Sequence, residues 1–238
     1  HAAALDGERE EVHCHLVHCY ALLGRLEDAE RHALLAIQQD PTCPHVHRHL
    51  AIGYLLDGRP LHALEAWRRV AALEPLHPEV EVGLGRCLAA LGRRGEARAR
   101  YVQALNGDFA ADAHAGLGDL AWGEGRLEAA AAEYRHAVLR DPDHTEARLR
   151  LAEILGELGL VSEALTHAEA LQPLWDPGQG AAPPSWVGDA EVAAVVARLL
   201  GQAGRRGRAL HLLRRFTRAM PHSVDAATRL GSYLLDAG

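Results

Sequence analysis

The segment HCHLVHC, residues 13–19, contains five side chains that can bind a transition metal. Thiolate and imidazole groups are common zinc ligands in proteins. Cys14 and His18 are four residues apart, so on a helix they would lie on one face, about 6 Å from each other. His49 and Glu79 carry further ligand groups, but only the fold could bring them near. The chemistry of this segment therefore depends on the elements that position it.

The composition is typical of a folded domain with a helical core. Of the 238 residues, 48% are hydrophobic but only 5% are aromatic, so the core requires close packing of small side chains between helices. There is no run of about 18 apolar residues, the length that spans a membrane. Four cysteines are too few for a disulfide scaffold and favour a reducing compartment such as the cytoplasm.

Glycine, alanine and proline recur along the chain with a period close to 34 residues. The intervals in the glycine series are 34, 34, 33, 34, 45 and 34 residues, and an alanine follows each of the first six glycines by five residues. The glycines are Gly24, Gly58, Gly92, Gly125, Gly159, Gly204 and Gly238; the alanines are Ala29, Ala63, Ala97, Ala130, Ala164 and Ala209; the closing prolines are Pro41, Pro75, Pro142 and Pro221. This spacing indicates a chain built from repeats.

The residues of one repeat predict two packed helices. Apolar residues at helical spacing precede each glycine, for example Leu16, Tyr20 and Leu23, and predict a first helix, helix A. Glycine can end this helix because it adopts the left-handed conformation without a steric penalty. The alanine then lies on the inner face of a second helix, helix B, where its small side chain lets the two helices approach closely. Proline ends helix B.

This pattern resembles the tetratricopeptide repeat (TPR) family. The second repeat matches it with Leu50, Ala51, Tyr54, Gly58, Ala63, Trp67 and Pro75, and the fourth with Leu117, Gly118, Gly125, Ala130, Tyr134, Ala137 and Pro142. Val70 and Ala121 depart from it. The resemblance implies an all-α fold, a right-handed α-solenoid of stacked helix-turn-helix repeats.

The predicted domain organisation has three parts. Residues 1–173 form five repeats, residues 174–189 form a Pro/Gly-rich insertion, and residues 190–238 form a sixth repeat followed by a capping or truncated helix. The repeats are expected at 10–43, 44–77, 78–110, 111–144, 145–173 and 190–223. The stretch QPLWDPGQGAAPPSW at 172–186 cannot be helical; it is either a hinge or a loop whose Trp175 and Trp186 pack back on the solenoid. Because the first residue is not Met and the last lies within a repeat, we expect a longer protein.

In the TPR family, helix A lines a concave groove that usually holds an extended peptide or a partner helix. Counting from the start of each repeat places acidic, basic and histidine side chains in this groove, with one tryptophan. The predicted groove residues are Cys14, His18, His45, Arg48, His49, Glu79, Arg86, Asp119, Trp122, Arg150 and Glu153. The same count places the small residues Gly83 and Gly116 there. Such a groove suits a peptide with basic and apolar character.

One set of groove residues could hold a metal ion: Cys14, His18, His49 and Glu79. There is no CxxC pair and no HExxH motif, and 10 of the 16 histidines lie in the first 77 residues, so proximity is expected without a dedicated site. We therefore predict no metal and no cofactor, with this set as the alternative. Cys19 and Cys87 occupy the tenth place of their repeats and are predicted to be small buried residues. Neutral histidines in the groove could make partner binding sensitive to pH.

The sequence predicts no enzymatic activity. The absence of lysine excludes Schiff-base catalysis and the lysine of a phosphate-binding loop, and the glycines follow the repeat rather than a phosphate-binding motif. Residues 190–238 contain eight arginines and three acidic residues, whereas residues 1–189 contain 17 and 29. The Arg-rich segment 198–218 is therefore either a solvated outer face or a docking site for an acidic partner. A nucleic-acid partner is not expected.

Two functions remain open from the sequence. The first is a non-catalytic protein–protein interaction scaffold that binds a peptide or protein segment in the concave groove. The alternative is the substrate-recruiting arm of a larger modifying enzyme, such as a glycosyltransferase. In both cases the ligand is a protein or peptide.

Overall fold

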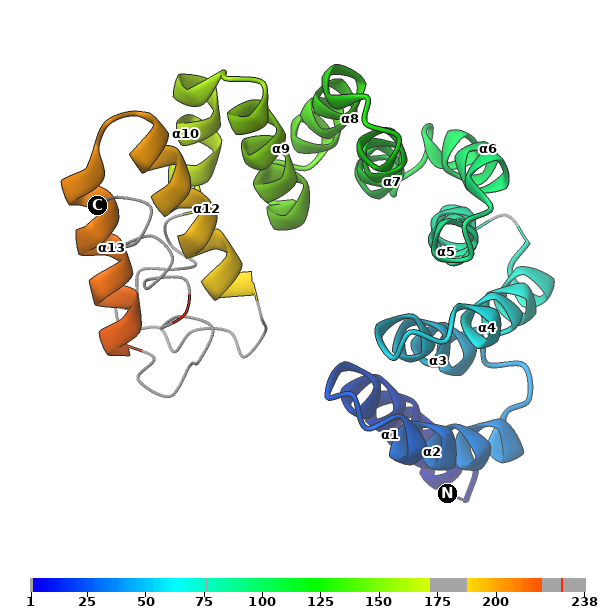
Figure 1. Ribbon diagram of the computed structural model, residues 1–238. Coiled ribbons are helices and arrows are strands. Elements are labelled where there is room, and N and C mark those ends of the chain that lie inside the picture. Colours follow the sequence, from blue (N-terminus) through cyan, green and yellow to red (C-terminus); the bar gives the residue numbers. More distant parts are fainter. Residues whose placement is uncertain (1, 76, 172–187, 220–227, 229–238) are drawn as a thin grey trace. The chain divides into compact units, whose positions relative to one another are not determined.

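A computed structural model describes residues 2–75, 77–171, 188–219 and 228 (Figure 1). Within these ranges the secondary structure consists of helices and the turns between them, without a strand. The predicted all-α fold is thus confirmed. The chain divides into two compact units, His1–Leu120 and Ala121–Gly238, here called the N-terminal and C-terminal units. In the described part of the chain, no helix is long and apolar enough to cross a membrane.

The N-terminal unit stacks helical hairpins in the manner of an α-solenoid. Its helices are α1 (Ala2–Leu22), α2 (Leu26–Gln39), α3 (Pro44–Leu56), α4 (Pro60–Leu73), α5 (Pro78–Ala90), α6 (Arg94–Ala104) and most of α7 (Ala110–Gly123). α1 packs on α2, α3 on α4, and α5 on α6, and successive hairpins meet through α1 and α3, α2 and α3, and α4 and α5. Odd-numbered helices are therefore the A helices here, and each expected pair of helices is present.

The C-terminal unit continues the same alternation. After the end of α7 it contains α8 (Leu127–Arg140), α9 (Thr145–Glu157), α10 (Val161–Glu169), α12 (Gly188–Gln202) and α13 (Arg206–Ala219). α9 packs against α8 and α10, and α12 packs against α10, α13 and α9. The A helices of this unit are α9 and α12. The predicted insertion at 174–189 lies almost entirely outside the described residues, as does most of the predicted final helix, so the proposed domain boundaries stay a prediction.

Small side chains at the helix crossings form the repeating core. The six alanines that follow the glycines by five residues are all fully buried, from Ala29 to Ala209. A large aromatic residue of helix B fills the space beside them in three repeats: Trp67, Tyr101 and Tyr134 are almost completely buried. Trp67 and Tyr101 also lie against glycines of the next helix A, Gly83 and Gly116, so each of these two rings fills space between two repeats.

Glycine ends helix A in every described repeat. Gly58 has a φ of 70°, the N–H of Arg59 donates to the carbonyl of Tyr54 at 2.7 Å, and the N–H of Gly58 donates to the carbonyl of Leu55 at 3.1 Å. These two bonds satisfy carbonyls that the end of a helix would leave without partners. Six glycines of the predicted series have positive φ, which confirms their role in the turn.

Gly58→Ala is expected to destabilise the N-terminal unit by about 1–2 kcal/mol, because an L-residue is strained at positive φ. A Cβ at this position would meet no atom within 4 Å, so the cost comes from the backbone alone. Gly95→Ala is the matched control: a Cβ there also meets nothing, but Gly95 lies in α6 without a positive φ. Urea unfolding followed by circular dichroism measures both variants. Equal stability of the two would contradict the assigned role of Gly58.

One side-chain prediction for the first repeat is wrong. Cys19 is exposed, whereas Cys87, at the same place in the third repeat, is buried as expected. The difference has a physical cause: α5 packs against the preceding helix B, α4, whereas no helix B precedes α1 among the described residues. Leu23, which the apolar pattern assigned to helix A, lies in the turn just before Gly24 and is 69% exposed.

Candidate partner-binding surface

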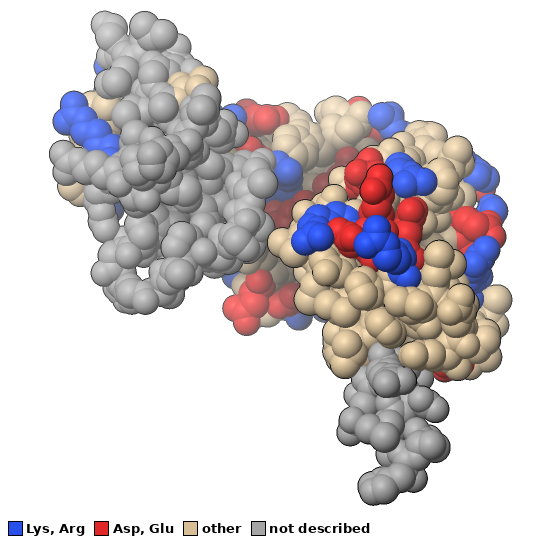
Figure 2. Space-filling view, turned by 90° about the horizontal axis from the view of Figure 1, so that it is seen from below, with Lys and Arg blue, Asp and Glu red and all other residues tan. Residues whose placement is uncertain are grey.

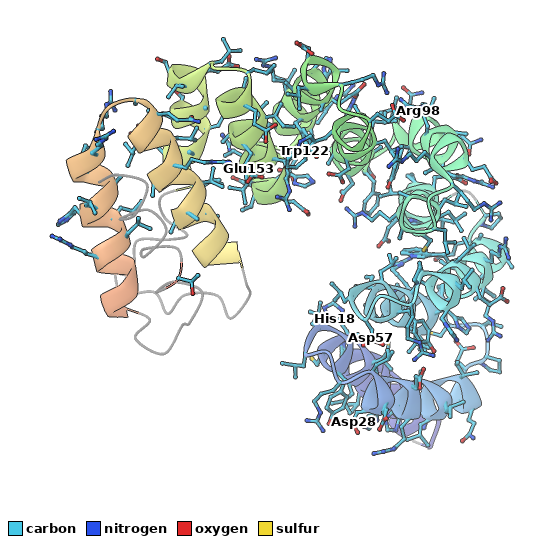
Figure 3. All side chains as sticks on the ribbon, viewed as in Figure 1. His18, Asp28, Asp57, Arg98, Trp122 and Glu153 are labelled. Carbon is cyan, nitrogen blue, oxygen red and sulfur yellow. The ribbon has the colours of Figure 1, made fainter. Side chains whose placement is uncertain are left out.

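The eleven predicted groove residues lie on A helices, and none of them is buried. In the N-terminal unit they come from α1, α3, α5 and α7, and their side chains form what we call the N-terminal face: Cys14, His18, His45, Arg48, His49, Glu79, Arg86 and Asp119. In the C-terminal unit they are Trp122, Arg150 and Glu153, which we call the C-terminal face. His18, Trp122 and Glu153 are labelled in Figure 3.

Arg48 links two successive repeats of the N-terminal face. From α3, its Nη2 donates to Glu74 Oε2 at 2.9 Å, and its Nε lies 3.1 Å from Glu79 Oε2, as an ion pair without hydrogen-bond geometry. Only 14% of its side chain is exposed, so this arginine is largely held away from solvent. A third contact joins Nη1 to His45 Nδ1 at 3.3 Å. Arg48 is thus neutralised by carboxylates of its own hairpin and of the next helix A.

The same pattern recurs one repeat later. Arg86 on α5 donates from Nη2 to Asp112 Oδ1 on α7 at 2.6 Å. Opposite charges alternate here rather than forming a patch of one sign. In Figure 2, blue basic and red acidic side chains likewise lie side by side on the part of the surface that is not grey. The charged residues named on the N-terminal face and their partners comprise two arginines and four carboxylates: Arg48, Arg86, Glu74, Glu79, Asp112 and Asp119. This face therefore has an excess of negative charge.

A pair of imidazoles connects α1 to α3. His18 Nδ1 and His49 Nδ1 are 3.1 Å apart, with ring centroids 4.5 Å apart and ring planes inclined by 53°. Burial, together with the positive charge of the neighbouring His18, His45, Arg48 and His15, lowers the pKa of His49 to about 4. His49 is therefore neutral at physiological pH, and in the free protein one ring of the pair donates its N–H to the other.

The structure brings together only part of the alternative metal set. His18 and His49 are in contact, but Cys14 packs against the hydrophobic cluster around Val17 and Ala21. Glu79 pairs with Arg48. Across the residues that the structure describes, no group of three or more His, Cys, Asp or Glu side chains is arranged to hold a metal ion. The four side chains therefore do not converge as one four-ligand site.

The C-terminal face combines an aromatic ring with ion pairs. The guanidinium of Arg150 lies over the Trp122 ring, 5.6 Å from its centroid, and its Nη1 donates to Glu153 Oε2 at 2.9 Å. Arg198 on α12 approaches the other oxygen of Glu153 at 3.6 Å. Glu153 thus joins α9 to α12, in the same way that Glu79 joins α5 to α3.

The Arg-rich segment 198–218 lies on the surface where it is described. Arg205, Arg206, Arg208 and Arg214 are exposed, while Ala209, Leu212 and Leu213 of α13 are buried. The side chains of Arg215 and Arg218 lie outside the described residues. The segment therefore presents arginines to solvent on one side of α13.

Several contacts within the first repeat, and one between it and the second, were not predicted from the sequence. His13 on α1 and His32 on α2 form a second imidazole pair, with their Nδ1 atoms 3.0 Å apart, and His32 also stacks on Tyr20. The Tyr54 hydroxyl donates to Glu30 at 2.8 Å, and burial together with this contact raises the pKa of Tyr54 to about 12. A helical wheel of helix B, aligned with that of helix A, could have indicated that His32 faces α1.

The predicted placement of Gly83 and Gly116 in the groove is wrong. Both glycines are buried, and a Cβ on either would come within 2.5 Å of an aromatic ring, that of Trp67 for Gly83 and that of Tyr101 for Gly116. They face helix B of the preceding repeat, where the aromatic side chain needs the space that a missing Cβ leaves.

Comparison with known proteins supports the repeat and limits what can be transferred. Tetratricopeptide repeat models match residues 84–138 and 121–177. Such repeats are generally non-catalytic and serve as scaffolds for protein–protein interaction. "Tetratricopeptide repeat protein 8" of Caenorhabditis elegans is 29% identical over 146 residues, which are 60% of this chain and 27% of that protein.

A second curated relative is an enzyme by name. "Protein O-mannosyl-transferase TMTC1" of Homo sapiens is 35% identical over 88 residues, which are 37% of this chain and 10% of that protein. The chain thus spans about a quarter and a tenth of the lengths of these two relatives.

A solved structure has the same arrangement over almost the whole chain. That of PilW, described as a widely conserved type IV pilus biogenesis factor, has a TM-score of 0.69 and 17% identity, and the match covers 93% of this chain and 98% of PilW. At this identity the likeness shows the fold alone. The repeat models, the relative named for the repeat and the glycine turns agree: the chain belongs to the tetratricopeptide repeat family.

Proposed function

We propose that this chain is a non-catalytic scaffold that binds an extended, basic and apolar segment of a partner protein along the N-terminal face. The observation that carries this proposal is the charge pattern of that face. Its two arginines are paired with three carboxylates of neighbouring elements, and Asp119 adds a fourth negative charge on the same face. An excess of negative charge attracts a segment with basic side chains and orients it as it approaches.

Apolar side chains on the same helices support the second part of the proposal. Ile52 and Leu55 of α3 are half-buried and pack against a core cluster that extends from the second repeat into the fourth. Their remaining exposed area can be covered by an apolar side chain of the partner. Burial of apolar area contributes affinity, while the surrounding charges set specificity.

Selection of a phage-displayed random-peptide library on the full chain tests this function. The enriched peptides are expected to combine Arg or Lys with aliphatic residues. Asp119→Asn, which removes a charge from the exposed α7 side of the face, is expected to weaken their binding by roughly fivefold to tenfold, about 1–1.4 kcal/mol. Fluorescence anisotropy of a labelled enriched peptide measures the change.

Glu65→Gln is the matched control because it removes one negative charge from an exposed position of α4, a B helix. The proposal requires the control to bind like the original chain. Equal weakening by both variants would mean that only net charge matters. Acidic enriched peptides whose binding weakens with salt would instead assign the partner to the exposed arginines of segment 198–218.

The alternative function is the substrate-recruiting arm of a larger modifying enzyme. Its support is the 88-residue match to a protein named as an O-mannosyl-transferase. The gene sequence on either side of these 238 residues distinguishes the two functions: an adjoining transferase domain favours the arm, and further repeats alone favour the scaffold.

A further inference from the structure

We infer that His18 and His49 form a binding site for a divalent transition-metal ion such as Zn²⁺, with their two Nδ1 atoms as the protein ligands. The pair joins the A helices of the first two repeats, and the two nitrogens are 3.1 Å apart. The pair lies on the N-terminal face, but ion binding can be tested apart from partner binding because it requires only the chain and the ion.

The distance between the nitrogens fits two ligands of one ion. With zinc–nitrogen bonds of about 2.0–2.1 Å, nitrogens at this separation subtend an angle of about 100° at the metal, close to the tetrahedral value. Two imidazoles sharing an ion in this way would have ring centroids about 4.8 Å apart, whereas an end-on N–H···N bond would place them about 5.4 Å apart. The centroids of His18 and His49 are 4.5 Å apart, nearer to the separation expected for a shared ion. Those of His13 and His32 are 5.2 Å apart, nearer to the separation expected for an end-on hydrogen bond.

The charges around the pair permit a cation. The groups that face His49 are His15 and His18 on α1 and His45 and Arg48 on α3. Arg48 is the only permanent positive charge among them, and the carboxylates of Glu74 and Glu79 both contact it. A neutral imidazole is the form that binds metal.

The ligand set selects the class of ion and the kind of site. Imidazole nitrogens suit zinc, copper and nickel, whereas calcium and magnesium require oxygen ligands. Since the described residues provide no group of three ligands, water completes the coordination sphere. A site with open positions exchanges its ion more readily than a closed structural site.

Isothermal titration of Zn²⁺ into the full chain, purified without a metal column and treated with a chelator, tests the inference. One binding event is expected whose dissociation constant rises at least tenfold in His49→Gln and likewise in His18→Gln. Two variants are used because replacement of the half-buried His49 could disturb the fold, which circular dichroism monitors. Long-range ¹H–¹⁵N spectra of the imidazoles should show zinc on Nδ1 of both rings.

His32→Gln is the control because it removes one imidazole of the His13–His32 pair, between α1 and α2, and leaves His18 and His49 in place. Retention of the binding event in this variant, with its loss in the other two, supports the site. The inference is overturned if the original chain binds no zinc, if either His18→Gln or His49→Gln binds as tightly as the original, or if His32→Gln loses the same event.

Discussion

Trp67→Ala is expected to destabilise the N-terminal unit by about 3–5 kcal/mol, the cost of emptying the site of a large buried aromatic residue. Only 3% of Trp67 is exposed. Its ring lies over Gly83 of the next helix A, so closely that a Cβ there would be 2.2 Å from Cε2. Because α4 and α5 belong to successive repeats, the lost contact weakens the interface between them as well as the hairpin itself. Urea unfolding followed by circular dichroism measures the change.

Trp67→Phe separates the packing of this ring from its polar group. The indole Nε1 is buried and has no hydrogen-bond partner within the described structure. Phenylalanine keeps most of the ring and removes this unsatisfied donor, so we expect it to cost much less than alanine. A loss below about 1 kcal/mol for Trp67→Ala, or equal losses for both variants, would show that the ring does not carry the interface.

Features that repeat with the period of the chain could be predicted from the sequence. Glycine at the end of helix A and alanine on the inner face of helix B recur at fixed spacing, and each has one dominant physical cause. Gly58 needs a positive φ, and Ala63 needs to be small at a helix crossing. The residues of one repeat therefore predict the structure of the others, including where each repeat begins. The helices α3, α5 and α9 begin at Pro44, Pro78 and Thr145, at the expected starts of their repeats.

Features that depend on a neighbouring repeat could not be predicted in the same way. Cys19 and Cys87 share a place in the repeat, but among the described residues only Cys87 follows a helix B, α4, that packs against its own helix. Gly83 was placed in the groove by counting, yet it is buried because the preceding repeat has a tryptophan at the contact. The position of a residue within its repeat determines the helix face on which it lies. Whether that residue is buried depends on the side chains of the adjacent repeat.

The candidate binding surface shows the same division. Counting placed His18, Arg48, His49 and Glu79 on A helices that line the predicted groove, but it did not show which of them pair. Pairing depends on rotamers and on the offset between successive helices, since Arg48 reaches Glu79 while His18 meets His49. As a result, the Nδ1 atoms of His18 and His49 face each other, whereas the Glu79 carboxylate forms an ion pair with Arg48.

Acidification from pH 7.5 to 5 is expected to destabilise the N-terminal unit through two histidines of α3. The pKa of His49 is lowered from 6.5 to about 4, mainly by burial, and burial together with Arg69 lowers the pKa of His47. Between these values the unfolded chain binds protons that the folded chain does not. Stability is therefore complete above about pH 6.5 and is lost as the pH falls toward 4. Allowing for solvent screening, we expect His49 to contribute on the order of 1–2 kcal/mol of this loss.

Urea unfolding at pH 7.5, 6.5, 5.5 and 5 measures this dependence, and His49→Gln should remove part of the slope. Ile52→Gln, a polar substitution at another half-buried position of α3, removes no titrating group and should keep it. The range stops at pH 5 because carboxylates with lowered pKa values, such as Glu96, lose their contribution below that. An unchanged slope in His49→Gln would contradict the assignment.

Protonation of histidines at low pH adds positive charge to the N-terminal face. A basic peptide should therefore bind more weakly at pH 5.5 than at 7.5. Equal affinity at the two pH values would rule out histidine control of binding.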